Sequence, residues 1–116
     1  MCSAAAGQPA DALDEARSVL QQYSAALANL DADAVKKVQP SIDVDGLRRA
    51  FREMKTLEVV IDEIKLLSTD ASITRVSCRV VQTLTPKAGA RRATEVTRVV
   101  RLRRADRSWV IDGFER

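Results

Sequence analysis

Four side chains in this sequence combine a reactive or charged group with apolar surroundings, and these are the candidates for chemistry. Arg98 and Asp112 lie in two β-rich runs, Cys78 lies in a third, and Tyr23 lies on the apolar stripe of a predicted helix. The sequence contains no histidine, which excludes triads built on imidazole and removes the commonest metal ligand. We therefore expect no catalytic set, no metal site and no cofactor.

The first two β-rich runs predict a hairpin that places Arg98 among apolar residues. Runs 73–85 and 94–103 alternate apolar and polar residues, and the segment 86–90 between them contains Pro86 and Gly89. If Thr85 stands opposite Arg91, one face of the sheet carries three cross-strand pairs: Val80 with Val96, Cys78 with Arg98, and Val76 with Val100. An unpaired guanidinium would be costly to bury on this face, so we expect a carboxylate partner.

Asp112 in the last β-rich run is the predicted partner of Arg98. If Arg103 stands opposite Trp109, Asp112 lies diagonally from Arg98 on the same face. The hypothesis is a small, mostly apolar pocket whose polar end is Arg98 and Asp112, with Tyr23 and Cys78 on its walls, which binds a ligand without transforming it. The alternative is an ion pair that fixes strand register, with the tyrosine and the cysteine serving as core residues.

The opposite face of the predicted sheet mixes apolar side chains with arginines. Such a mixture is typical of protein interfaces and predicts a homodimer. Nucleic acid is the other partner considered, but only two Phe, one Trp and one Tyr are available for bases to stack on, so we expect none. The interface candidates are Ile73, Arg75, Val99, Arg101, Trp109 and Ile111.

Helices precede the β-rich runs. Apolar residues at steps of three and four predict a long helix from Pro9 to about residue 30. A second, short helix is capped by Asp31 or Asp33 and ends before Pro40, and a third is capped by Asp43 or Asp45. The spacing of apolar residues then changes to every second residue over 57–66, which predicts a strand with a bulge near Asp62 and Glu63.

Composition indicates a single domain. The 116 residues, 46% of them hydrophobic, suffice for one core, which we expect over residues 9–116 after a flexible segment 1–8. The net charge is only +3, with acids and bases interspersed. No run approaches the roughly 20 apolar residues that a membrane span requires, so we expect no span. The expected location is the cytoplasm if the chain is complete.

The order of elements and several local motifs resemble known domains. Three helices followed by four antiparallel strands resemble the nuclear transport factor two-like superfamily, which includes ketosteroid isomerases and SnoaL-like cyclases. Several short motifs also resemble the sequences of domains appended to bacterial serine/threonine kinases: Cys78-Arg79-Val80, Gln82-Thr83-Leu84-Thr85-Pro86-Lys87-Ala88-Gly89, Leu102-Arg103-Arg104 and Ser108-Trp109-Val110-Ile111. The resemblance implies an α+β fold in which three N-terminal helices pack on a curved four-stranded antiparallel sheet, forming a cone-shaped barrel with a pocket.

Two classes of function follow from this resemblance and from the residues. The favoured one is a non-catalytic sensory or accessory domain that binds a small apolar or acidic ligand or another protein, and that is appended to a bacterial kinase. An extracytoplasmic location is then expected if that kinase is a membrane protein. The alternative is a small-molecule isomerase, dehydratase or cyclase of the ketosteroid isomerase or SnoaL type. The missing histidine and the lack of paired acids favour the first class.

Overall fold

A computed structural model of this protein describes residues 9–106 and 108–115. The segment 1–8, predicted to be flexible, lies outside the described residues. The described chain forms three helices and then four strands: α1 Pro9–Ala28, α2 Ala32–Val38, α3 Val44–Arg52, β1 Met54–Thr69, β2 Ile73–Pro86, β3 Arg92–Ala105 and β4 Ser108–Glu115. The strands form one antiparallel sheet in the order β1-β2-β3-β4. The predicted α+β architecture is confirmed.

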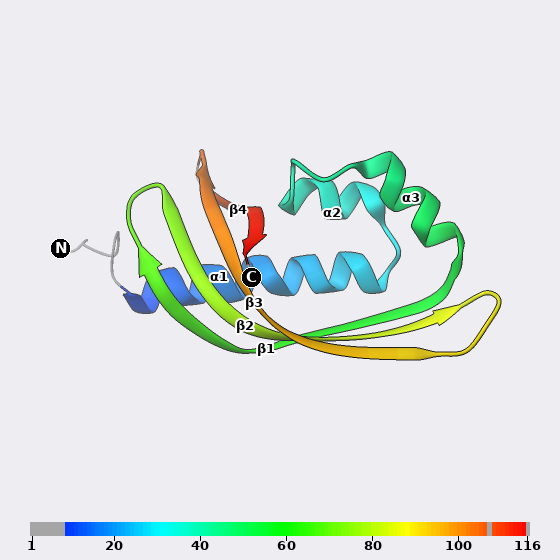
Figure 1. Cartoon of the computed structure of the whole chain (residues 1–116). Helices are drawn as coiled ribbons and strands as arrows, with labels where there is room; N and C mark the ends of the chain where they lie inside the picture. Colours follow the sequence, from blue (N-terminus) through cyan, green and yellow to red (C-terminus); the bar gives the residue numbers. More distant parts are fainter. Residues whose placement is uncertain (1–8, 107, 116) are drawn as a thin grey trace.

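The sheet is strongly curved, and α1 lies along its concave side (Figure 1). Ala16 and Leu20 of α1 pack there against Val76 and Val100 of the central strands. A second cluster joins α1, α2 and α3 to the start of β1 through Leu27, Val35, Phe51 and Leu57. No helix in the described part of the chain is long and apolar enough to cross a membrane.

Short polar side chains set the starts of α2 and α3. Asp31 Oδ1 accepts a hydrogen bond from the Ala34 N–H, and Asp43 Oδ1 accepts one from the Gly46 N–H, each at 3.1 Å. These bonds satisfy backbone donors that a helix leaves free in its first turn. Helix α2 ends at Val38, just before Pro40, because a proline disfavours helical geometry in the residue before it.

Strand β1 contains the predicted bulge. Its register with β2 shifts between Asp62 and Lys65, and Glu63 adopts a positive φ of 51°. The register of the β2–β3 hairpin is also as predicted, with Cys78 opposite Arg98 and Val80 opposite Val96. The position of Arg98 on the concave face is therefore correct.

The predicted register of the last hairpin is wrong. Strand β3 pairs Leu102 with Ile111, one residue away from the predicted register, and a further shift then places Val100 opposite Phe114. The extra residue forms a β-bulge, which changes the face on which the following side chains lie. The register before this bulge already exchanges the faces of the two interface candidates on β4, and both are core residues: Trp109 is 8% exposed and Ile111 is 0% exposed.

The register of β4 predicts that truncating two isoleucines, Ile111 and Ile73, lowers the stability of the fold by different amounts. Ile111→Ala should lower the free energy of unfolding by about 2 to 5 kcal/mol, because it leaves a cavity in a fully buried site. The matched variant Ile73→Ala changes a partly exposed side chain at the start of β2 and should cost clearly less. Urea denaturation of both variants measures the difference. Equal losses would contradict the observed burial of Ile111.

Candidate functional site

A groove opens on the concave side of the sheet, between α1 and the halves of β2 and β3 nearest the turn that joins them. Its volume is about 480 Å³. Five of its lining side chains are entirely apolar, and the other four carry a polar group. The lining residues are Tyr23, Leu27, Val59, Val80, Gln82, Thr94, Val96, Arg98 and Phe114.

Tyr23 of α1 and Phe114 of β4 form the aromatic end of this groove. Their ring centroids lie 5.8 Å apart and their planes are inclined by 44°. Burial raises the pKa of the Tyr23 hydroxyl above its ordinary value. The hydroxyl therefore stays protonated at neutral pH and can donate a hydrogen bond to an occupant of the groove.

Arg98 provides the positive charge of the groove. Its side chain is exposed at the rim, and within the described part of the chain it forms no ion pair. Gln82 and Thr94 lie opposite each other on β2 and β3 and add an amide and a hydroxyl to the same lining. The groove thus presents a guanidinium, two hydroxyls and an amide around apolar walls.

The predicted pair of Arg98 with Asp112 is wrong. The Arg101 Nε donates to Asp112 Oδ2 at 2.8 Å, and the Arg103 Nε lies 3.3 Å from Asp112 Oδ1. The one-residue difference in the register of β4 puts Asp112 on the outer face, where these arginines lie. Their hydrogen bonds and charges lower the pKa of the Asp112 carboxyl.

The other arginines of the outer face are also paired with carboxylates. Arg75 donates from Nε and Nη2 to the two carboxylate oxygens of Glu115, at 3.1 and 2.8 Å. The interface candidates that do lie on or beside this face are Ile73, Arg75, Val99 and Arg101. The homodimer stays a prediction, now without Trp109 and Ile111.

Cys78 does not line the groove. It is 1% exposed and packs in the core beneath α1. Burial, and then the negative charge of Asp62, raise the pKa of its thiol, so the thiol stays protonated and is a poor nucleophile. Of the four predicted site residues, the structure brings together Tyr23 and Arg98 only.

Sequence reasoning missed Gln82 and Thr94, although the signal for them was present. The correctly predicted β2–β3 register puts both residues on the face that carries Val80 and Val96. Leu27 and Val59 could not be found in this way, because their positions depend on how α1 crosses the sheet.

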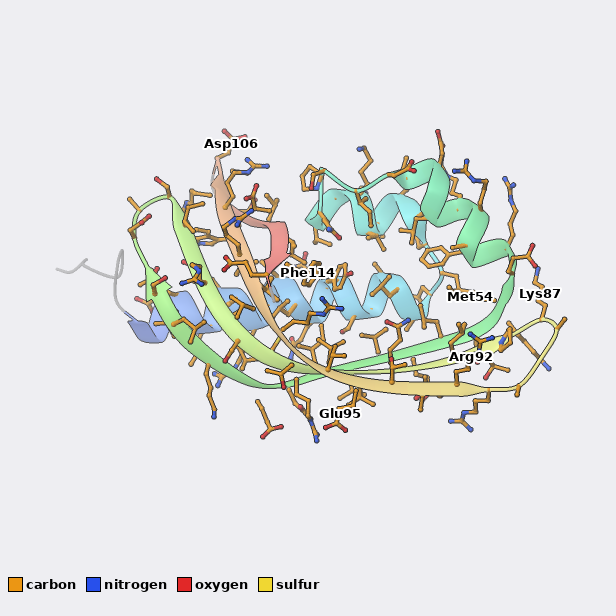
Figure 2. The ribbon with its side chains drawn as sticks, in the orientation of Figure 1. Met54, Lys87, Arg92, Glu95, Asp106 and Phe114 are labelled. Atoms are coloured by element: carbon orange, nitrogen blue, oxygen red, sulfur yellow. The ribbon has the colours of Figure 1, made fainter. Side chains whose placement is uncertain are left out.

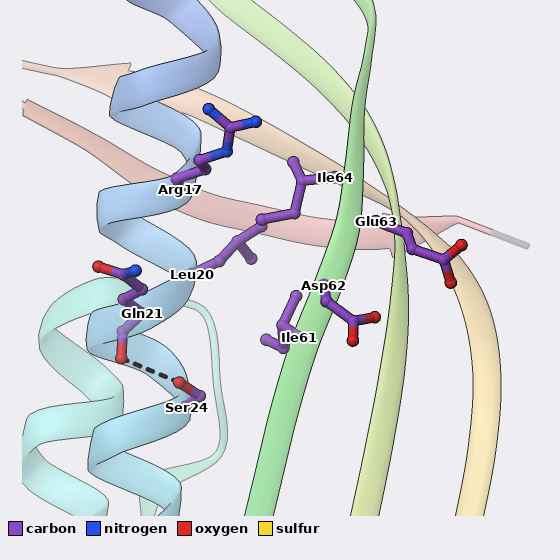
Figure 3. Close-up of a pocket in the computed structure, with 8 residues that line it drawn as sticks. All are labelled: Arg17, Leu20, Gln21, Ser24, Ile61, Asp62, Glu63 and Ile64. Atoms are coloured by element: carbon purple, nitrogen blue, oxygen red, sulfur yellow. Dashed lines mark hydrogen bonds between the residues drawn. The ribbon is translucent and has the colours of Figure 1, made fainter.

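A second depression, of about 380 Å³, lies between α1 and the bulge of β1 (Figure 3). Figure 3 shows Leu20, Ile61 and Ile64 between helix and strand, whereas the carboxylates of Asp62 and Glu63 project away from the helix. Both Asp62 oxygens accept hydrogen bonds of 2.8 Å from Arg79. This pairing lowers the pKa of Asp62, which makes its carboxylate a weak base.

No protein-family model and no curated protein matches this sequence. Solved structures do match the fold. A protein from Novosphingobium aromaticivorans, whose name proposes an aromatic ring hydroxylase, has a TM-score of 0.81 at 14% identity, over 92% of this chain and 88% of that one. A protein from Streptomyces avermitilis, whose name proposes a dehydratase of the NTF2-like family, has a TM-score of 0.75 at 9% identity, over 92% and 95%.

A third match bears a name that mentions a protein kinase. A protein from Xanthomonas campestris, whose name proposes a calcium/calmodulin-dependent protein kinase II association domain, has a TM-score of 0.70 at 15% identity, over 99% of this chain and 90% of that one. The matches show that this protein has the nuclear transport factor two-like cone fold, as the sequence predicted.

The partner of Asp112 can be tested with two double-mutant cycles. Arg98→Met and Asp112→Asn should be additive in the free energy of unfolding to within about 0.5 kcal/mol, because the two groups lie on opposite faces. Arg101→Met and Asp112→Asn should show a coupling that shrinks as salt is added. Urea denaturation at low and high salt measures both cycles. Coupling in the Arg98 cycle alone would contradict the observed register.

The outer ion pairs also predict a dependence of stability on acid. The arginines lower the pKa of Asp112 and of Glu115 in the folded state, so each carboxylate stabilises the fold above its unfolded pKa of about 4. That contribution is lost as the pH falls through the lowered, folded pKa. The double variant Asp112→Asn, Glu115→Gln should therefore lose less stability than the parent between about pH 5 and pH 2. If the urea midpoints of the parent and of the double variant fell in parallel across this range, the assigned stabilising role of these two carboxylates would be contradicted.

Proposed function

We propose that this domain binds a small ligand with an apolar body and an anionic end in the groove beneath α1, and that it does not transform this ligand. The observation that carries the proposal is the guanidinium of Arg98, which has no carboxylate partner within the described residues and lies at an apolar groove. A cavity with apolar walls and few polar groups is the usual form of a small-molecule site.

The polar groups of the groove favour a carboxylate as the anionic end. Arg98 can donate two parallel hydrogen bonds to a carboxylate, and the protonated Tyr23 hydroxyl can donate a further one. Phe114 and Val96 are 38% and 40% exposed, so an apolar body that covers them would remove apolar surface from water.

Catalysis by an isomerase, dehydratase or cyclase is the second candidate. The names of the matching structures from Novosphingobium and Streptomyces favour it. Such reactions need a group that accepts a proton, and the described residues lining the groove offer a phenol, an amide, a hydroxyl and a guanidinium. The carboxylate of Asp62 is already engaged with Arg79 elsewhere. Binding therefore fits these groups better than turnover does.

A sensory or accessory role gives this binding a context. The motifs that look like domains appended to bacterial kinases support it, and so does the name of the matching structure from Xanthomonas. In such a protein, occupancy of the groove by a small acid would be the signal.

A naphthalene probe pair tests the proposal. The chain should bind 2-naphthoate, and Arg98→Met should weaken that binding about tenfold, or about 1.4 kcal/mol. Binding of the uncharged 2-naphthalenemethanol should be weaker and should not respond to Arg98→Met. Calorimetric titration measures both ligands.

The control variant is Lys87→Met, which removes a positive charge in the β2–β3 turn, outside the groove. It should bind naphthoate as the parent does. The proposal is wrong if naphthoate fails to bind at millimolar concentration, or if Arg98→Met and Lys87→Met weaken binding equally.

A further inference from the structure

The half of β3 nearest the β2–β3 turn, residues 92–98, is a free sheet edge. Strand β4 pairs only with the part of β3 from Val99 to Ala105, so residues 92–98 have β2 on one side and no strand on the other within the described chain. All of residues 92–98 are exposed. Figure 1 shows this half of β3 extending well beyond the short β4.

This edge lacks the bulges, prolines and glycines that interrupt a strand edge, and its protection against strand addition consists of charged side chains. Strand β1, at the other edge of the sheet, has three register shifts in its pairing with β2 and a positive φ at Glu63. Residues 92–98 run in unbroken register with β2 and contain neither proline nor glycine. Bulges and prolines protect an edge because they interrupt its row of unpaired backbone groups. Such a row is intact on β3.

The side chains of this edge select a particular partner. The alternation of the strand puts Arg92, Thr94, Val96 and Arg98 on the concave side, and Figure 2 shows Arg92 and Glu95 on opposite faces. Neither Arg92 nor Arg98 forms an ion pair within the described residues. An added strand with an acid opposite each arginine and apolar residues between them would match this face.

We propose that the free edge of β3 binds an extended segment of another protein, whose residues on the concave side are acidic at both ends and apolar between them, as an added antiparallel strand in line with β4. Backbone hydrogen bonds to residues 92–98 supply the affinity, and Arg92 and Arg98 supply the selectivity. The added strand also covers the exposed side chain of Val96.

A second copy of this chain is a poorer occupant of the edge. Full antiparallel overlap of two such edges puts Glu95 opposite Glu95 and Arg92 opposite Arg98. Like charges directly opposite each other destabilise a strand pair. The charges of the edge therefore favour an acidic partner over self-association.

A capped, dye-labelled heptapeptide, Glu-Thr-Val-Lys-Val-Thr-Glu, tests the proposal by fluorescence anisotropy. Opposite residues 98 to 92, it places an acid against each arginine and a lysine against Glu95. It should bind, and Arg92→Glu should weaken binding about tenfold. The matched variant Lys87→Glu, in the neighbouring turn, should bind as the parent does. The charge-reversed peptide Lys-Thr-Val-Glu-Val-Thr-Lys should bind at least about tenfold more weakly.

Two further measurements separate strand addition from other modes of binding. The same peptide with alternate N-methylated amides keeps its side chains but lacks half of its donors, and it should not bind. Amide exchange should slow at residues 92–98 when the unmodified peptide is added.

Equal binding of the methylated peptide, or no binding of the unmodified one at millimolar concentration, overturns the proposal. So does slowed exchange at 92–98 that arises from self-association without peptide. Naphthoate binding should be unchanged in Arg92→Glu, so this edge and the groove are tested separately.

Discussion

The packing of α1 against the concave face of the sheet is the contact on which the rest of the structure depends. Ala16 of α1 and Val76, Val100 and Ile111 of the strands are fully buried in it. Each strand offers alternate residues to this face, so burial of one set commits the other set to the outer face. The alanine brings helix and sheet close together, and the interior fills without a disulfide or a metal in the described part of the chain.

The register and the bulge of β4 place three neighbouring side chains. In the observed register, strand alternation puts Ile111 in the core and Asp112 beside the arginines of the outer face. The extra residue then returns Phe114 to the concave side, where its ring meets Tyr23. The register of β4 therefore supplies a core residue and an ion pair, and the bulge supplies a wall of the groove.

The difference in length between β3 and β4 creates both candidate binding surfaces. Because β4 pairs only with the half of β3 nearest its C-terminal end, the groove stays open along residues 94–98, and the backbone of that half of β3 stays unpaired. Arg98 lies where the two surfaces meet. Its lack of a carboxylate partner within the described residues contrasts with the paired arginines of the outer face. Among the arginines of the strands, the two without a carboxylate partner in the described chain, Arg92 and Arg98, both lie on the concave side.

The sequence alone determined the order of the helices and strands, the bulge in β1 and the register of β2 with β3. These features follow from local signals: apolar period, capping aspartates, and a turn with proline and glycine at 86–90. They suffice to place Arg98 and Val96 on the concave face, and the same register would have placed Gln82 and Thr94 there.

Only the tertiary structure decided the register of β4, and with it the partner of Asp112 and the burial of Trp109. The physical reason is that strand side chains alternate with a period of two, so a shift of one residue exchanges the faces. The alternation within residues 108–115 is compatible with either register. Packing of Trp109 and Ile111 against α1 selects the one that is observed, and no local signal in the sequence reports that contact.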